Sequence, residues 1–233
     1  MLSPQLALNV SIRDGLSFDN FYSNADSREA VIYLRNWQPT EVFQSIALWG
    51  GAGSGRSHLL QAVVSEWDRL GRSTLYLPCQ ELLSMDPEAL LHGLEGFDLI
   101  ALDDIEALAG RRAWEHALFA LYNALHDRGG NLLLSSLMAT TDLPFVTADV
   151  ISRLAWGMTF KLPNLSDNEK IEALQLRAKG RGMVMADEVA KYILSRSSRE
   201  FSQLLSVLDT LDSATIEAQR KLTVPFVRSV CHW

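Results

Sequence analysis

Residues 50–57 read Gly50-Gly51-Ala52-Gly53-Ser54-Gly55-Arg56-Ser57. They follow an apolar run, 46–49, and precede a helix-like run, 57–70. Small residues between a strand and a helix let successive backbone N–H groups converge on a phosphate, and the helix N-terminus adds positive partial charge. Gly50, Gly55 and Ser57 meet the spacing G-x-x-x-x-G-K-[ST] of a phosphate-binding loop. The segment therefore predicts nucleotide binding; the alternative is a glycine-rich turn that binds nothing.

One residue of this loop departs from the pattern, because Arg56 stands where lysine is expected. Arginine keeps the positive charge, and its planar fork contacts phosphate oxygens in two places, so nucleotide binding is expected to survive. Arginine does not reproduce the compact charge that lysine brings to a transferring phosphoryl group. We therefore predict nucleotide binding with slow or absent turnover.

Strand-like and helix-like runs alternate between the loop and Pro163. Strands are expected at 46–49, 74–77, 97–102, 131–136 and 156–162, and helices at 57–70, 80–94 (with Pro87 as an interruption or a new start), 113–128 and 146–154. This alternation predicts a parallel sheet with helices on both faces. After Pro163 the strand signal disappears, and Ser166 with Glu169 forms a capping box that opens a series of helices. The predicted fold class is α/β, with an αβα domain at 17–163 and a small α-helical domain at 164–233.

Two carboxylates follow the predicted strand 97–102. Asp103 and Asp104 stand directly after its apolar residues. In open α/β sheets ligands lie at the carboxyl ends of the strands, so Asp103 is expected near the loop, where it would hold Mg²⁺ together with the Ser57 hydroxyl. Asp104 is the candidate for polarising a water molecule. The alternative is that these residues cap the segment that follows.

Composition excludes several classes of protein. The chain has 233 residues, 48% of them hydrophobic, a net charge of −7 and a sequence pI of about 5.2. Binding to nucleic-acid phosphates needs clustered Lys and Arg, so direct sequence-specific DNA binding is not expected. Cys79 and Cys231 lie far apart, without the spacing of a metal site or a disulfide framework. No apolar run reaches the roughly 18 residues that a membrane span needs, so a cytoplasmic protein is expected.

Three further features have both a structural and a functional interpretation. The aromatic residues within 18–22 either pack as plain core or wall a base-binding pocket. The peptide 5–10 is either a flexible terminus or an extended segment that fills pockets on a partner. Ser135 and Ser136 end a predicted strand, where a hydroxyl either senses a terminal phosphate or has no such duty.

Five motifs occur in the order that one protein family requires, and together they span nearly the whole chain. They are Phe18-Asp19-Asn20-Phe21, GGAGSGRSHLL at 50–60, Leu102-Asp103-Asp104-Ile105-Glu106, Ser152-Arg153-Leu154 and Ser198-Arg199-Glu200. With an αβα phosphate-loop domain and a helical lid, the chain resembles the AAA+ proteins, and among them the branch of the bacterial replication initiator DnaA. The arginine at position 56, the ending 219–227 and the lack of a helix-turn-helix domain after the lid make it more similar to the Hda family of that branch.

The resemblance implies ADP (or ATP) and Mg²⁺ as cofactors. The nucleotide would be bound by the loop 50–57, by Phe21 and His58, and by Arg199 as a second sensor on the lid. Arg196 lies only three residues before Arg199 in the sequence and is the alternative for the second sensor. The metal would be held by Ser57 and Asp103. The initiator family has an acidic residue where Leu137 stands, which together with Arg56 implies that the chain's own ATPase activity is weak or absent.

The resemblance also assigns a catalytic role to Arg153, as an arginine finger that acts in trans on a neighbouring subunit, with Asp104 as the other catalytic candidate. On the residues alone, Arg153 is as readily a surface or interdomain ion pair. Gln5, Leu6 and Leu8 match the clamp-binding peptide of the family, which places a clamp-binding segment at 1–16. The implied partners are DnaA and the sliding clamp (β subunit) of DNA polymerase III.

These features together imply regulatory inactivation of DnaA. The ADP-bound protein, tethered to the clamp, would stimulate hydrolysis of DnaA-bound ATP and prevent re-initiation of DNA replication. The alternative is an autonomous AAA+ ATPase or helicase-loader-like protein. A cytoplasmic protein is expected, associated with the nucleoid through the clamp and without membrane contact. A homodimer or a larger homo-oligomer is left open.

Overall fold

The computed structural model describes residues 15–218 and 221–233. The predicted clamp-binding residues Gln5, Leu6 and Leu8 lie outside this part of the chain. The described residues form two compact units. The first comprises 15–17, 36–49 and 56–160, and the second comprises 18–35, 50–55 and 161–233. The segment 18–35 and the glycine loop therefore belong to the unit that contains the C-terminal helices.

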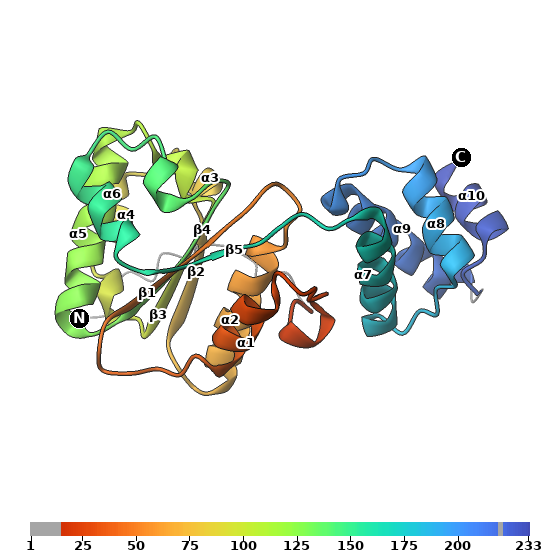
Figure 1. Cartoon of the computed structure of the whole chain (residues 1–233), viewed down its shortest axis with the longest axis horizontal. Coiled ribbons are helices and arrows are strands. Elements are labelled where there is room, and N and C mark those ends of the chain that lie inside the picture. The colour runs from red at the N-terminus through yellow and green to blue at the C-terminus, as the bar shows by residue number, and fades with distance from the viewer. Residues whose placement is uncertain (1–14, 219–220) are drawn as a thin grey trace. The chain divides into compact units, whose positions relative to one another are not determined.

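A five-stranded sheet forms the centre of the first unit (Figure 1). Its strands are β1 (Gln44–Trp49), β2 (Thr74–Pro78), β3 (Leu99–Asp103), β4 (Asn131–Ser136) and β5 (Met158–Lys161), in the order β2-β3-β4-β1-β5. The pairs β1–β4, β2–β3 and β3–β4 are parallel, as the sequence predicts. The register pairs Pro78 with Asp103 and Trp49 with Ser136, which are the last residues of their strands. The carboxyl ends of these strands therefore lie on the same side of the sheet.

Helices cover the two faces of this sheet. They are α2 (Arg56–Arg69), α3 (Cys79–Leu82), α4 (Pro87–Leu91), α5 (Arg112–Arg128) and α6 (Ala148–Ala155), with the 3₁₀ helices η2 (Leu94–Gly96), η3 (Ile105–Leu108) and η4 (Thr140–Asp142). In Figure 1, α2 lies on one face and α4, α5 and α6 lie on the other. Buried leucines of β4 alternate accordingly, because Leu132 and Leu134 belong to the core on the α5 side and Leu133 does not.

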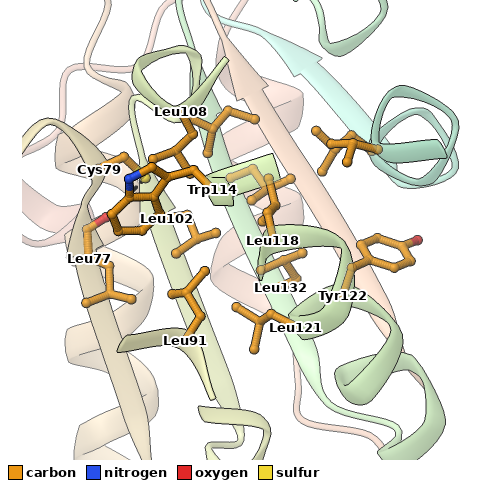
Figure 2. Close-up of a cluster of buried hydrophobic side chains, with 14 of the residues drawn as sticks. Leu77, Cys79, Leu91, Leu102, Leu108, Trp114, Leu118, Leu121, Tyr122 and Leu132 are labelled. Atoms are coloured by element: carbon orange, nitrogen blue, oxygen red, sulfur yellow. Dashed lines mark hydrogen bonds between the residues drawn. The ribbon is translucent and has the colours of Figure 1, made fainter. Parts of the chain in front are cut away.

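The core on the α5 side is a continuous cluster of large side chains (Figure 2). It contains Leu77, Cys79, Leu91, Leu102, Leu108, Trp114, Leu118, Leu121, Tyr122 and Leu132. Trp114, Leu118, Leu121 and Tyr122 recur at helical spacing along α5, which is why this helix turns one face to the sheet. The aromatic and aliphatic stripe predicted for this helix is therefore core.

Two predicted helices differ from the observed ones for identifiable reasons. The segment 80–94 forms two short helices, and Pro87 is a new start: the Asp86 side chain caps α4 by accepting from the backbone N–H groups of Glu88 and Ala89. The helix predicted at 146–154 begins later, at Ala148. The backbone N–H groups of Val146 and Thr147 are instead directed to the carboxylate of Glu115.

The second unit has a helical core of its own. It contains α7 (Asp167–Gly180), α8 (Asp187–Arg196), α9 (Phe201–Ala218) and α10 (Val224–Cys231). Ser166 and Glu169 form the predicted capping box at the start of α7, and the Thr223 side chain caps α10. The buried core residues are Leu174, Ala178, Met183, Val189, Ile193, Leu204, Leu208, Leu211, Phe226 and Val227.

The aromatic N-terminal segment is bound to α7 within this unit. It carries η1 (Phe18–Asn20) and most of α1 (Arg28–Asn36). The Tyr22 hydroxyl donates to Glu172 at 2.7 Å, Asn24 Nδ2 donates to Glu169 at 2.9 Å, and Arg177 donates to the Asn20 side chain at 3.0 Å. The hydrogen bond to Glu172 raises the pKa of Tyr22 to about 12.

Across 15–218 and 221–233, no helix combines the length and the apolar character that crossing a membrane requires.

Candidate functional site

The glycine loop has the strand–turn–helix form that its sequence predicts. It leaves β1 at Gly50, turns through a hydrogen bond from Ser54 N to Gly51 O (3.2 Å), and passes directly into α2 at Arg56. Gly53 and Gly55 have φ values of +77° and +92°, and residues that carry a Cβ rarely adopt this backbone conformation. These two positions therefore require glycine for backbone reasons alone.

The loop is also tightly enclosed within the second unit. A Cβ at Gly50 would lie 2.1 Å from the backbone oxygen of Leu162, and one at Gly55 would lie 2.6 Å from the ring of Phe21. At Gly51 the nearest atom would be Nδ2 of Asn164, at 2.9 Å. Phe21, predicted to wall a base pocket, thus lies against the loop. Asn164 was not predicted, and its place after Pro163 gives no local signal for this contact.

Two polar groups at the loop have no hydrogen-bond partner among the described residues. They are the buried hydroxyl of Ser54 and Nη1 of Arg56. Unsatisfied buried donors are unfavourable, and an anion that accepts from them would remove this penalty. The loop residues therefore fit a phosphate group by donor chemistry as well as by the shape of the backbone.

Arg56 is the first residue of α2, and its side chain is only 8% exposed. Its Nη2 lies 3.1 Å from Oδ1 of Asp104, and Nη1 lies 3.9 Å from Oε1 of Glu106. Burial raises the pKa of both carboxyls, and Asp103 raises that of Asp104 further, whereas Arg56 opposes the rise. Asp104 is thus engaged in an ion pair with the residue that replaces the loop lysine. Glu106 joins this cluster from η3.

Asp103 is buried and its two oxygens have different partners. The Tyr76 hydroxyl donates to Oδ2 at 2.6 Å, and the Ser135 hydroxyl donates to Oδ1. The Ser135 oxygen in turn accepts from the backbone N–H of Asp104, 2.8 Å away. Burial, followed by the Asp103 charge, raises the pKa of Tyr76 far above its usual range. The predicted terminal-phosphate role of Ser135 therefore competes with its bond to Asp103.

The predicted magnesium donors are few. Within residues 15–218 and 221–233, no group of three or more His, Cys, Asp or Glu side chains is arranged to hold a metal ion. The predicted set is the hydroxyl of Ser57, in the first turn of α2, and the carboxylate of Asp103. Each oxygen of Asp103 already accepts one hydrogen bond, and a carboxylate oxygen has a second lone pair available. This donor set fits a cation that keeps most of its water ligands.

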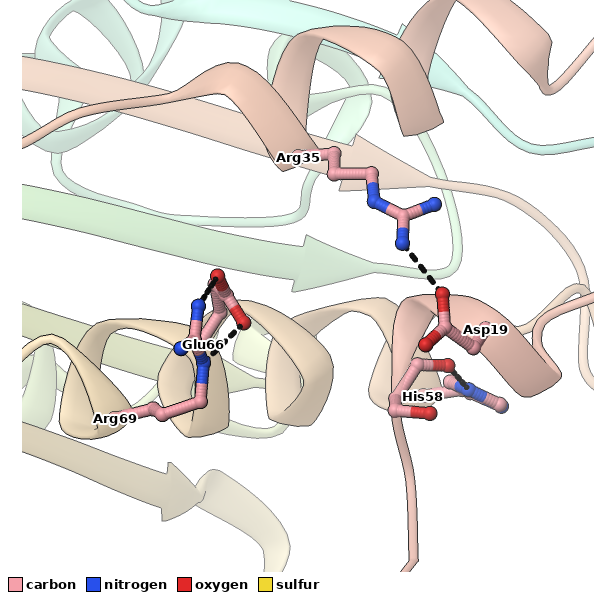
Figure 3. A network of polar contacts seen from close by, with 6 residues as sticks. Asp19, Arg35, His58, Glu66 and Arg69 are labelled. Carbon is pink, nitrogen blue, oxygen red and sulfur yellow. Dashed lines mark hydrogen bonds and ion pairs between the residues drawn. The ribbon is translucent and has the colours of Figure 1, made fainter.

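The other predicted nucleotide residues are placed as follows. His58 Nε2 lies 2.8 Å from the backbone oxygen of Ser17; Figure 3 draws this contact and also the pairs Arg35–Asp19 and Arg69–Glu66. Arg199 is 81% exposed, and its Nη1 lies 3.9 Å from Asp167. Arg196 lies over the ring of Tyr192 instead. Phe201, two residues after Arg199, has its Cβ and N 3.4 Å from where a Cβ of Gly53 would lie.

Arg153 lies on α6, in the first unit, close to two aromatic rings. Its guanidinium carbon is 4.9 Å from the ring centre of Trp156 and 6.0 Å from that of Tyr122. Within the described part of the chain, Arg153 makes neither an ion pair nor a hydrogen bond through its side chain. None of the described residues places a carboxylate within ion-pair distance of its guanidinium. Trp156 and Tyr122 were not predicted to belong to this site.

A buried carboxylate fixes the start of α6. Glu115 is fully buried and accepts hydrogen bonds from Gly110 N (2.8 Å), Val146 N (3.0 Å), Thr147 N (2.8 Å) and Thr147 Oγ1 (2.6 Å). Burial alone would raise the pKa of Glu115, but these hydrogen bonds outweigh it and lower the pKa below its ordinary value. No local pattern indicates this role, because a glutamate within an amphipathic helix is ordinarily exposed.

Family comparisons match both parts of the chain. The model for the bacterial DnaA ATPase domain matches residues 13–161. The model for the lid domain of Hda matches residues 167–231. The predicted resemblance is thereby confirmed, together with an α/β AAA+ domain followed by a helical lid.

Solved structures show the same fold. Domain III of the replication initiation protein DnaA from Thermotoga maritima is 16% identical, with 94% of this chain and 97% of that chain covered and a TM-score of 0.77. AMPPCP-bound DnaA from Aquifex aeolicus is 21% identical, with 85% and 65% covered and a TM-score of 0.67. The RuvB Holliday junction branch migration motor from Thermotoga maritima is 17% identical, with 95% and 73% covered and a TM-score of 0.65.

The buried Glu115 carboxylate generates a stability prediction. Glu115→Gln replaces an acceptor by an amide whose NH₂ opposes the backbone donors at 146 and 147, so we expect a loss of about 1–3 kcal/mol of unfolding free energy at pH 7. Because the folded pKa lies below the ordinary 4.5, the wild-type advantage is complete above that pH and is lost as the pH falls through the folded pKa.

Urea denaturation of both proteins between pH 7 and pH 3 measures this difference. Glu88→Gln, at an exposed position, is the control, and a small difference independent of pH is expected for it. A Glu115→Gln difference that stays constant down to pH 3 would contradict the assignment.

Proposed function

Because this chain belongs to the bacterial DnaA ATPase-domain family of AAA+ proteins, we propose that it binds ADP or ATP and acts as a regulatory inactivator of DnaA. In this proposal the ADP-bound protein is tethered to the sliding clamp of DNA polymerase III through Gln5, Leu6 and Leu8. It presents Arg153 to ATP-bound DnaA, stimulates hydrolysis there and thereby prevents re-initiation. It works in the cytoplasm, at the nucleoid.

The unpaired charge of Arg153 carries the proposal. A finger that acts in trans must offer its guanidinium to another molecule, where it stabilises the charge that develops on the transferring phosphoryl group. A guanidinium already bound to a carboxylate would first have to leave it. Within residues 15–218 and 221–233, the contacts of the Arg153 guanidinium are with two aromatic rings, and no acceptor there takes a hydrogen bond from its N–H groups.

The nucleotide is proposed to bind at the loop 50–57. Support comes from the positive φ values of Gly53 and Gly55, from the unpartnered Ser54 hydroxyl and from the ring of Phe21 against the loop. When bound, the nucleotide supplies an anion and Mg²⁺ supplies countercharge through Ser57 and Asp103. In this proposal the nucleotide in the chain's own site serves as a conformational brace, so that Arg153 is presented to DnaA.

Weak hydrolysis by the chain itself follows from the Arg56 cluster. Asp104 is the candidate base, and its nearest Oδ1 lies 3.1 Å from the Arg56 guanidinium. Arg56 lowers the pKa of Asp104 against the rise caused by burial and by Asp103, and its guanidinium is paired with the oxygen that would otherwise accept a proton from water. Leu137, where the initiator family has an acidic residue, is 43% exposed and supplies no charge. These features count against the alternative of an autonomous ATPase or helicase loader.

The first prediction from this proposal concerns nucleotide affinity. Asp104→Asn removes one negative charge and releases Arg56 for the phosphates, so ADP is expected to bind roughly threefold to tenfold more tightly. Arg56→Gln is expected to bind ADP at least tenfold more weakly. Isothermal titration calorimetry with ADP and Mg²⁺ measures both.

Asp68→Asn is the matched control, because it removes an exposed charge from the same helix α2 without touching Arg56. Unchanged or weaker ADP binding by Asp104→Asn would contradict the proposed competition between Asp104 and phosphate for Arg56.

The second prediction concerns action in trans. Arg153→Ala is expected to reduce the stimulated hydrolysis of DnaA-bound ATP roughly a thousandfold, with ADP affinity and clamp binding unchanged. Deleting residues 5–8 is expected to abolish stimulation that depends on clamp loaded on DNA. Release of phosphate from DnaA-bound ATP is the measurement, and Arg128→Ala, an exposed arginine of α5, is the control.

No stimulation by the wild-type protein, combined with rapid ATP turnover by the protein alone, would replace this proposal by the autonomous ATPase. Loss of clamp binding in Arg153→Ala would contradict the separate roles given to the two segments.

A further inference from the structure

We propose that Trp156 and Tyr122 are positioning residues: their rings form a cation–π platform that holds the Arg153 guanidinium extended and unpaired, ready for an anionic group of the partner. This inference rests on the proposed function of Arg153. The two ring centres lie 4.9 Å and 6.0 Å from the guanidinium carbon, and tryptophan offers a cation the strongest aromatic face.

The backbone fixes one side of this platform. Trp156 ends α6 with φ −77° and ψ −18°, and its N–H donates to the carbonyl oxygen of Arg153 at 3.2 Å. This last turn places the side chains of residues 153 and 156 on neighbouring positions of the helix. The next residue must be small, because a Cβ at Gly157 would lie 2.5 Å from the backbone oxygen of Ser45. The chain therefore has little freedom to carry Trp156 away from Arg153.

The core fixes the other side. Tyr122 is a residue of α5 and only 2% exposed, and its ring meets Phe43 edge-on with centroids 4.9 Å apart. The start of α6 is held to the same helix α5 by Glu115 through the N–H groups of Val146 and Thr147. Arg153 is thus carried by a short helix whose first residues and last turn are both anchored.

Contact with a ring leaves the N–H donors of a guanidinium available to another acceptor, whereas an ion pair occupies them. A ring contacts the flat face of the guanidinium, whereas the N–H donors point outward in its plane. Arg196, like Arg153, lies over an aromatic ring. Three other described arginines are paired with carboxylates instead: Arg35 with Asp19, Arg69 with Glu66 and Arg181 with Asp209. Each of these would have to exchange one carboxylate for another anion. Arg153 can accept a phosphate-like group without breaking a prior bond.

Trp156 is also well placed to be covered by the partner. Its side chain is 70% exposed although it is among the largest apolar groups of the chain. A partner that docks over the indole would exclude water from the guanidinium, and electrostatic stabilisation is stronger in a dry site. Positioning and docking make different kinetic predictions, so they are separable.

The experiment measures hydrolysis of DnaA-bound ATP against the concentration of the protein with ADP and loaded clamp. Trp156→Leu is expected to lower the maximal stimulated rate roughly fivefold to thirtyfold, with the half-saturating concentration unchanged. Trp156→Phe is expected to restore part of the rate. In an Arg153→Ala background, Trp156→Leu is expected to have no further effect. Val184→Ala, which trims another exposed apolar side chain in the second unit, is the control.

A wild-type maximal rate in Trp156→Leu, or a change confined to the half-saturating concentration, would overturn the positioning role. The second of these outcomes would make Trp156 a docking contact. The thermal unfolding temperature and the ADP affinity of each variant are measured as controls. Wild-type values exclude a folding defect as the cause of either result.

A second measurement does not depend on DnaA. In protein with ¹⁵N-labelled arginine, the Hε signal of Arg153, assigned by its loss in Arg153→Lys, is expected to be shifted upfield by the ring current and to return toward the random-coil position in Trp156→Leu. An Arg153 signal without this shift overturns the platform. If the shift is present but wild-type protein does not stimulate DnaA, the proposed function fails and the platform stands.

Discussion

A positive charge at the first position of α2 is almost completely removed from water, and this constraint governs the candidate site. A buried guanidinium needs countercharge, because the penalty for desolvating an unpaired ion is large. Asp104 and Glu106 provide the countercharge from the end of β3 and from η3. The same contact occupies the carboxylate that would otherwise be free to activate water. In the proposed function, the residue that helps the loop to bind an anion therefore also limits hydrolysis of that anion.

Two other buried carboxylates, Asp103 and Glu115, accept hydrogen bonds and have no cationic side chain as partner among the described residues. Asp103 is satisfied by the hydroxyls of Tyr76 and Ser135, which joins the ends of β2, β3 and β4. Glu115 is satisfied by backbone N–H groups and one hydroxyl, which joins α5 to the start of α6. Oriented donors of this kind stabilise a carboxylate while keeping its neighbours in fixed positions. The carboxyl ends of the strands and the helix that carries Arg153 are therefore both held by hydrogen bonds to a buried carboxylate.

Arginine has two distinct uses in this molecule. Arg56 is buried and paired, so it contributes to local structure and to the proposed binding of an anion. Arg153 lies over aromatic rings and forms no ion pair with any described residue, so in the proposed function its charge is available to another molecule. This division agrees with the proposed role of a protein that binds nucleotide itself but promotes hydrolysis elsewhere. Arginine and lysine would not be equivalent at either position, because both arrangements depend on a planar guanidinium.

Local patterns in the chain were enough to predict the phosphate loop, the parallel sheet, the capping box at Ser166 and the all-helical C-terminal region. Glycine spacing, strand–helix alternation and capping act over a few residues, so they can be read along the chain. Contacts between distant segments could not be read in this way. The pairing of Arg56 with Asp104 and Glu106, the hydrogen bonds of Glu115 to residues 146 and 147, and the contact of Arg153 with Tyr122 each join residues from different elements. Packing alone brought these residues together, because their side chains meet only after the sheet and helices have assembled.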